Sequence, residues 1–258
     1  MQILKFWDLF WSYYQSETKT DKLIIVAIWA PNLMDIDNLR NAKILTQAWY
    51  DIVTPEYYWF CRSSWKFTPK NSIKTLLDTR RFFIDWEAYS IYSGKKVKVQ
   101  YNDFIFLGIS YGGWVVSLLP KYDDTISKIA MFYPVTNYST FGKRWVKEET
   151  VEDFLRTLKE WFSRFFRWID LPIWKKHLRD KTDMIPIKNL KYLENSKVFL
   201  AHWTNDTSIY YKKTREYYQE LKEKFPNGNY KYIEYEWLWH WESTMFSASY
   251  DMIKFFKK

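Results

Sequence analysis

Hydrophobic and polar residues follow one another along the chain in blocks that predict alternating strands and helices. Unbroken apolar runs are typical of strands buried on both faces of a parallel sheet. Between these runs, apolar residues recur at helical spacing, as within 37–50 and 71–89. This succession predicts an α/β fold with one mostly parallel, doubly wound sheet flanked by helices. The four clearest apolar runs are residues 23–28, 104–107, 129–132 and 198–201.

Weaker patterns extend this picture toward both ends of the chain. Residues 3–15 alternate loosely, which indicates an edge strand or a hairpin, and 230–235 resembles another strand. The stretches 208–225 and 243–258 are amphipathic and charged, as in surface helices. We therefore expect the sheet to continue beyond the last long apolar run, with one helix before and one helix after its final strand in the sequence.

Residues 103–119 combine a strand, a sharp turn and a buried helix, with a serine at the apex. The turn runs from Gly108 to Gly112 and reads GISYG, the G-x-S-x-G pattern of a nucleophile elbow. Such a turn holds the serine in a strained conformation, and small residues on either side let strand and helix pass closely. Because the chain has only 6 glycines in 258 residues, we favour Ser110 as a nucleophile over a plain glycine turn.

An activated serine needs a general base, which is most often a histidine. The chain has three. His240 follows the strand-like stretch 230–235, in a turn from which a base can reach over the serine. His202 ends an apolar strand and His177 lies in a basic helical segment, and both settings are more typical of structural histidines. His240 is the favoured base, with His202 and His177 as alternatives.

A carboxylate that orients the base completes such a site. Asp206 follows the apolar strand that ends at His202 and precedes a helix, which gives the chain order serine, aspartate, histidine. An aspartate at this place is also common as a helix N-cap or in a turn. Asp183 and Glu242 are the weaker alternatives.

Three blocks of the sequence together resemble the α/β-hydrolase superfamily, most closely its prolyl-oligopeptidase and dienelactone-hydrolase-like branches. They are the elbow at Ser110, the H-x-x-N-D-x-x-I block within 198–209, and the E-Y-E-x-L-x-H-x-E block of 234–242. The resemblance covers nearly the whole chain. It implies the α/β-hydrolase fold, with Ser110 as nucleophile, Asp206 as acid and His240 as base.

The resemblance also implies an oxyanion hole, formed by the backbone N–H groups of Tyr111 and Ala30. The expected reaction is two-step acyl transfer from a small-molecule ester or a short peptide, with no metal and no cofactor. We expect an esterase or an acyl-peptide hydrolase. The alternative is a non-catalytic binding protein on the same fold. Oligomeric state is not readable from the sequence.

Residues 141–190 interrupt the alternation of strands and helices. Thr150 and Asp153 resemble a capping box, and apolar residues follow at helical spacing. We expect one domain over residues 1–258, with 141–190 inserted late in the sheet as a small helical cap. Three phenylalanines of this cap either line a substrate pocket or only pack the cap onto the core. They are Phe162, Phe165 and Phe166.

The net charge of +9 and a pI near 9.2 raise the possibility of a nucleic-acid or anionic-surface partner. The basic residues are spread over many segments, so we expect no nucleic-acid partner. No apolar run is long enough to span a membrane, and the first residues do not resemble a signal peptide. The single cysteine excludes an intrachain disulfide. We expect a cytoplasmic protein with no membrane partner.

Tryptophan stands at many positions where the resembled family has glycine. The chain has 16 tryptophans and 6 glycines, whereas average glycine usage of about 7% gives about 18 glycines. We hypothesise that most of these tryptophans are UGA codons that the host reads as glycine. A true tryptophan-rich protein with an aromatic ligand surface is the alternative. The positions are Trp29, Trp65, Trp114, Trp203, Trp237, Trp239 and Trp241.

Overall fold

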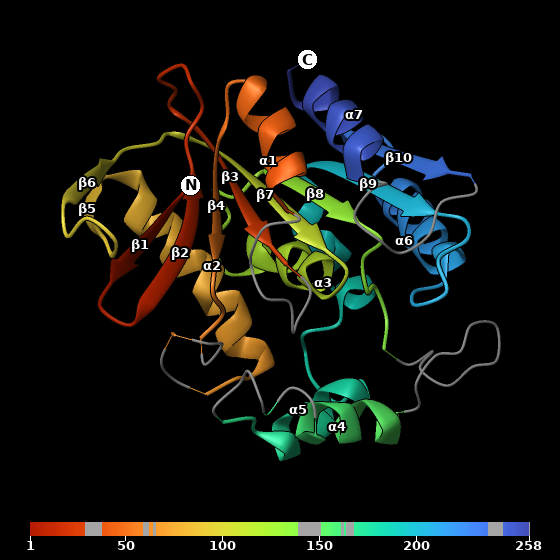
Figure 1. Cartoon of the computed structure of the whole chain (residues 1–258). Coiled ribbons are helices and arrows are strands. Elements are labelled where there is room, and N and C mark those ends of the chain that lie inside the picture. The colour runs from red at the N-terminus through yellow and green to blue at the C-terminus, as the bar shows by residue number, and fades with distance from the viewer. Residues whose placement is uncertain are drawn as a thin grey trace.

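A computed structural model of the chain describes residues 1–28, 38–58, 62–63, 66–138, 151–160, 163, 168–236 and 245–257. A twisted sheet runs through the centre, with helices on both faces (Figure 1). Ten strands form the sheet in the order β10-β9-β8-β7-β3-β4-β2-β1-β5-β6. They are β1 Gln2–Phe6, β2 Leu9–Tyr14, β3 Lys22–Ala27, β4 Asp51–Pro55, β5 Trp86–Ser90, β6 Lys96–Val99, β7 Asp103–Ile109, β8 Lys128–Phe132, β9 Lys197–Trp203 and β10 Tyr230–Tyr235.

Seven α-helices surround the sheet in the described part of the chain. Helices α1 and α7 pack against each other on one face, α2 and α3 lie on the other, and α6 packs on β9 and β10 (Figure 1). The helices are α1 Asn38–Gln47, α2 Pro69–Ile84, α3 Tyr111–Ser117, α4 Val151–Glu160, α5 Leu171–Leu178, α6 Tyr211–Lys224 and α7 Met245–Lys257. Within the described residues, no helix is long and apolar enough to cross a bilayer.

The apolar runs form the parallel centre of the sheet, as their composition predicts. Strand β3 pairs in parallel with both β4 and β7, and β7, β8, β9 and β10 continue in parallel. Ile24 and Ile25 are adjacent in β3, point to opposite faces, and are both fully buried. Burial on both faces explains why these strands are continuously apolar. The predicted doubly wound α/β fold is confirmed.

The first strands form a hairpin, one of the two outcomes predicted for residues 3–15. Strands β1 and β2 are antiparallel, but they are not at the edge, because β1 also pairs with β5. The helix predicted over 71–89 ends earlier. Thr68 caps α2 by accepting from the N–H of Asn71, and Asp85 leaves the helix with an extended backbone. The chain then forms the β5–β6 hairpin, which the sequence patterns did not predict.

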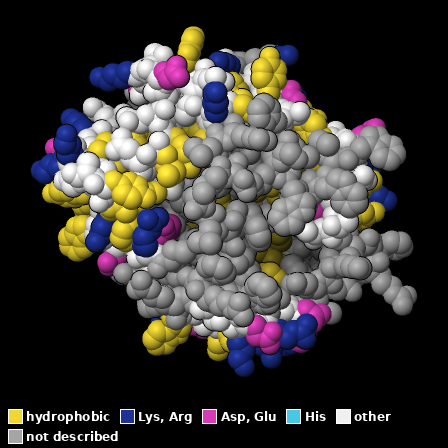
Figure 2. Space-filling model, viewed as in Figure 1, with side chains coloured by type: hydrophobic (Ala, Val, Ile, Leu, Met, Phe, Trp, Pro, Cys, Tyr) yellow, Lys and Arg dark blue, Asp and Glu magenta, His cyan; other side chains and the backbone are white. Residues whose placement is uncertain are grey.

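Charged side chains are dispersed over the surface. On the face shown in Figure 2, Lys and Arg are scattered and lie among Asp and Glu. Several form ion pairs, such as Lys96 with Glu87 (2.9 Å) and Arg80 with Asp123 (2.8 Å). Among the described residues on this face, the basic side chains therefore do not form a single basic patch.

Candidate active site

Ser110 lies at the junction of β7 and α3 with a backbone conformation that few residues adopt. Its φ is 54° and its ψ is −115°, and a positive φ is costly for any residue with a Cβ atom. Hydrogen bonds hold it there. The Ser110 N–H donates to the Phe132 carbonyl (3.0 Å), and the Ser110 carbonyl accepts from the N–H of Gly113 (2.9 Å). Strain of this kind persists only where the surroundings enforce it, and it is frequent at active sites.

Glycines around Ser110 allow three backbone segments to meet. A Cβ atom at Gly108 would lie 2.3 Å from the Gly112 carbonyl oxygen, and one at Gly112 would lie 1.8 Å from the Ala27 carbonyl oxygen. Both distances are far below van der Waals contact. The small residues of the G-x-S-x-G pattern are therefore required by close approach of β3, β7 and α3, as the sequence analysis expected.

Tyr111 begins α3, so its backbone N–H has no acceptor within the helix. The positive end of the helix dipole lies at the same place. Its side chain is fully enclosed, donates to Ser72 Oγ (2.8 Å), and stacks on Trp114 with ring centroids 5.3 Å apart. Burial raises the pKa of the Tyr111 hydroxyl well above its usual value. The residue after the serine is thus a fixed, neutral part of the core.

Asp206 follows β9 in a tight, buried loop. Its Oδ1 accepts from the backbone N–H groups of Ser208 and Ile209, both at 2.8 Å. Its Oδ2 lies 3.3 Å from Nε2 of His202. Hydrogen bonds to the ionised form of a buried carboxylate compensate for its lost hydration. The loop therefore keeps the buried carboxyl group in one orientation.

The sheet places Ser110 and Asp206 at the same edge. In a parallel sheet the carboxyl ends of all strands share an edge. Ser110 follows β7 and Asp206 follows β9, with only β8 between them. His240, which follows β10, lies outside the described residues, as do Ala30, Glu242 and the cap residues Phe162, Phe165 and Phe166. Their assigned roles stay predictions.

His177 belongs to an aromatic cluster on α5. The imidazole ring packs edge-on against Trp114 (4.6 Å between centroids) and Tyr138 (4.9 Å), and its Nδ1 bonds to Thr182 Oγ1 (3.0 Å). Burial lowers the pKa of His177 to about 3. Nε2 has no hydrogen-bond partner within the described residues. His177 is therefore a neutral core residue, and no carboxylate of the described residues orients it.

The pH dependence of stability provides a test of this environment. An unfolded histidine titrates near pH 6.5, so below that pH the unfolded chain binds a proton that folded His177 does not. The free energy of unfolding is expected to fall as pH is lowered from about 6.5, by up to about 1.4 kcal/mol per pH unit. His177→Leu is expected to remove this part of the slope. Urea unfolding at pH 7 and pH 5 measures it, and an unchanged slope in the variant would contradict the assignment.

Asp183, the alternative acid, forms an ion pair at the surface. Its carboxylate pairs with Lys121 Nζ at 2.7 Å and is largely exposed. The hydrogen bond from Lys121 lowers the pKa of this carboxyl. Asp183 therefore belongs to a surface ion pair. Among the described residues, no three His, Cys, Asp or Glu side chains form a cluster that could hold a metal ion.

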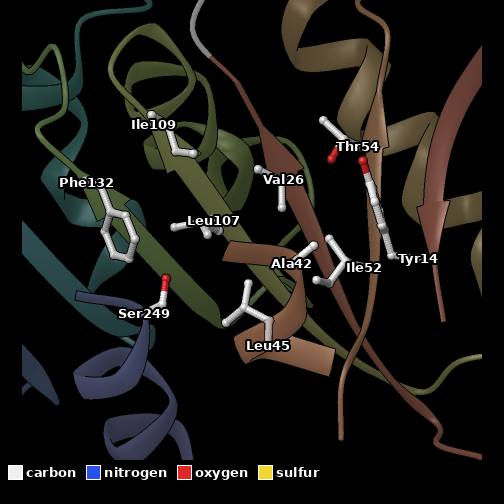
Figure 3. A pocket seen from close by; sticks show the side chains of 10 residues that line it. All are labelled: Tyr14, Val26, Ala42, Leu45, Ile52, Thr54, Leu107, Ile109, Phe132 and Ser249. Carbon is white, nitrogen blue, oxygen red and sulfur yellow. The ribbon is translucent and has the colours of Figure 1, made fainter. Parts of the chain in front are cut away.

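The small pocket drawn in Figure 3 lies on the opposite face of the sheet from α3. Side chains from the strands, from α1 and from α7 surround it, including Leu107, Ala42 and Ser249. Its volume is about 30 Å³, which is enough for a water molecule but far below the few hundred Å³ of a typical ligand pocket. This cavity therefore does not accommodate an acyl group.

The strand order, the parallel centre and the strained serine after a central strand define the α/β-hydrolase fold. No family model and no curated protein sequence matches the chain. The structure is similar to Est1E from Butyrivibrio proteoclasticus, with a TM-score of 0.68 over 99% of this chain and 98% of that one, at 13% identity.

Two further solved structures show how widely this fold is shared. A Paleococcus ferrophilus monoacylglycerol lipase gives a TM-score of 0.65 over 96% of this chain and 100% of that one, at 11% identity. The Pyrococcus horikoshii acylaminoacyl peptidase gives 0.63 over 99% of this chain, at 15% identity, but only 40% of that chain is covered. The chain thus corresponds to less than half of that longer protein.

Proposed function

We propose that the protein is a serine hydrolase that cleaves a carboxylic ester, or an amide or peptide bond, through an acyl-enzyme on Ser110. The observation that carries this proposal is the backbone of Ser110, held at φ 54° between β7 and the start of α3. A turn of this kind directs the serine hydroxyl out from the carboxyl edge of the sheet and places helix N–H groups beside it. The similarity in fold to Est1E and to a monoacylglycerol lipase supports the same class of chemistry.

The proposed mechanism assigns one role to each site residue. His240 takes the Ser110 proton as Oγ attacks the substrate carbonyl, and then protonates the leaving alcohol or amine. Asp206 orients His240 and stabilises its cation. The N–H groups of Tyr111 and Ala30 bind the developing oxyanion. Water then attacks the acyl-enzyme, with His240 again as base, and releases the acid and free Ser110.

The proposed substrate is a small ester or a short peptide. Est1E has been observed with ferulic acid bound, and the Pyrococcus horikoshii protein is an acylaminoacyl peptidase. We propose that 141–190 forms a cap in which Phe162, Phe165 and Phe166 line the acyl pocket. The contact between Trp174 of α5 and Tyr111, with ring centroids 5.8 Å apart, supports a cap beside the serine.

Covalent labelling tests the proposal directly. A fluorophosphonate probe is expected to modify the folded protein at one site, and peptide mass spectrometry is expected to locate the adduct on Ser110. Ser110→Ala is expected to abolish labelling with no loss of folded structure. A folded protein that is not labelled, or is labelled equally in Ser110→Ala, would refute the hydrolase proposal and favour a non-catalytic binding protein.

A further inference from the structure

His202 is a fully buried side chain in contact with the acid of the proposed site. It occupies the penultimate position of β9, four residues before Asp206. Its Nε2 lies 2.9 Å from the Ile209 carbonyl oxygen and 3.3 Å from Asp206 Oδ2. Its Nδ1 lies 2.7 Å from Thr214 Oγ1 on α6. The ring therefore links the strand, the acid loop and the following helix.

These contacts fix the tautomer of His202. A carbonyl oxygen only accepts hydrogen bonds, so Nε2 must carry the proton that faces the Ile209 carbonyl. Asp206 Oδ2 lies 3.3 Å from the same nitrogen. In the neutral ring Nδ1 is then an acceptor, and the Thr214 hydroxyl donates to it. The N–H of Nε2 therefore lies beside the carboxylate of Asp206.

We propose that His202 is a positioning residue for Asp206, an inference that rests on the proposed function. Two backbone N–H groups hold Oδ1 of Asp206, and Nε2 of His202 lies 3.3 Å from Oδ2. These contacts restrict rotation of the carboxylate, so that it keeps one orientation for the proposed base. Displacement of a catalytic group by about 1 Å can lower rates by about 100-fold.

Paired substitutions separate positioning from packing. His202→Leu is expected to lower kcat for p-nitrophenyl acetate by about 10- to 100-fold with KM changed less than about twofold. His202→Gln places an amide N–H near the position of Nε2, so it is expected to retain kcat within about threefold. His177→Leu, the same change at a buried histidine that does not touch Asp206, serves as control and is expected to keep kcat.

Each outcome has one meaning, provided that circular dichroism shows folded variants. Full activity of His202→Leu would refute the proposal. Equal losses in the Gln and Leu variants would also refute it, because packing alone would then explain the effect. If His202→Leu does not fold, His202→Gln and His202→Asn are compared instead, since Asn is too short to reach Asp206. A wild-type protein that Ser110 probes do not label refutes the proposed function itself.

A second proposal rests on two turns in which tryptophan occupies a place built for glycine. Trp7 is the first residue of the two-residue loop between β1 and β2, with φ 51°, while Asp8 does not share the positive φ. This is the pattern of a type II′ turn, which takes glycine at its first loop position. The Trp7 side chain is 79% exposed.

Trp49 ends α1 in the same unusual way. Its φ is 71°. The Tyr50 N–H bonds to the Leu45 carbonyl, and the Trp49 N–H bonds to the Thr46 carbonyl. These two hydrogen bonds are those of a Schellman motif, whose left-handed residue is most often glycine. The Trp49 side chain is 61% exposed and gains little by burial.

Trp203 is also unfavourably placed, in this case inside the core and because of its indole N–H. It follows His202 at the end of β9, is fully buried, and its indole N–H has no acceptor among the described residues. A buried donor without a partner is unfavourable. By contrast, Trp174 donates to the Phe67 carbonyl at 3.1 Å. We propose that the native protein has glycine at positions 7, 49 and 203, encoded by UGA codons read as glycine.

Mass spectrometry of the protein from its native host tests this proposal. Peptides with glycine at 7, 49 and 203 are expected, and intact tryptophan there would refute the proposal. In the chain as written, Trp7→Gly and Trp49→Gly are each expected to raise Tm by about 2–4 °C, because each relieves a left-handed residue. Trp86→Gly, at an exposed strand position, is the control and is expected to lower Tm. Lower Tm in all three variants would contradict the backbone argument.

Discussion

Ser110→Ala is expected to lower kcat for ester hydrolysis by at least about 1000-fold, with little change in thermal stability. Loss of the hydroxyl removes the group that forms the acyl-enzyme, and residual turnover relies on substrate binding and the oxyanion hole alone. The left-handed backbone is as costly for alanine as for serine, so the folded state keeps its strain. Steady-state kinetics with p-nitrophenyl acetate and a thermal melt measure the two quantities.

A second serine provides the matched control. Ser117 is buried on the same helix, and its hydroxyl donates to the Trp114 carbonyl at 2.7 Å. Ser117→Ala therefore removes a buried hydroxyl seven residues away without touching the elbow. It is expected to retain kcat. Equal activity of Ser110→Ala and the wild-type protein would refute the assignment of Ser110 as nucleophile.

The centre of the fold was predictable because its signals are local. A parallel strand covered on both faces must be apolar along its whole length, and β3 and β7 have this composition. The elbow is also local, since Gly108 and Gly112 lie within two residues of Ser110. Steric requirements between residues close in the chain can be recognised from the sequence alone.

The β5–β6 hairpin was missed because its stability comes from distant residues. Strand β5 pairs with β1, about 80 residues earlier in the chain. Strand β5 follows directly after α2, and the sequence gives no clear signal that the helix ends there. The pairing of this segment with β1 and β6 is what distinguishes a strand from a longer helix.

The contact between His202 and Asp206 was not visible in the sequence for a similar reason. The H-x-x-x-D spacing was present, but the direction of the ring depends on Thr214 of α6 and on the loop carbonyl of Ile209. The turns at Trp7 and Trp49 likewise became recognisable only from their φ angles. Backbone conformation and ring orientation arise from packing that no single segment encodes.

Gly112→Ala is the other substitution with a large expected effect. The added Cβ would lie 1.8 Å from the carbonyl oxygen of Ala27 and 2.5 Å from its carbonyl carbon. Both are backbone atoms of the central strand β3, which cannot move without disturbing its pairing with β4 and β7. Overpacking against a rigid core is expected to lower the free energy of unfolding by at least about 3 kcal/mol and to displace Ser110. Urea unfolding and fluorophosphonate labelling measure the two effects.

Gly94→Ala distinguishes this steric effect from the general cost of replacing glycine. Gly94 has φ +64°, but a Cβ there would have no atom within 4 Å. The free energy of unfolding of the variant is therefore lowered only by the left-handed backbone, by about 1–2 kcal/mol. Labelling of Ser110 by the probe is expected to proceed at the wild-type rate. If Gly112→Ala were no less stable than Gly94→Ala, β3 and α3 would not be in the close contact described, and the strained elbow would need another cause. A larger loss in Gly112→Ala, together with slower labelling, would show that the approach of α3 to β3 keeps Ser110 in its reactive position.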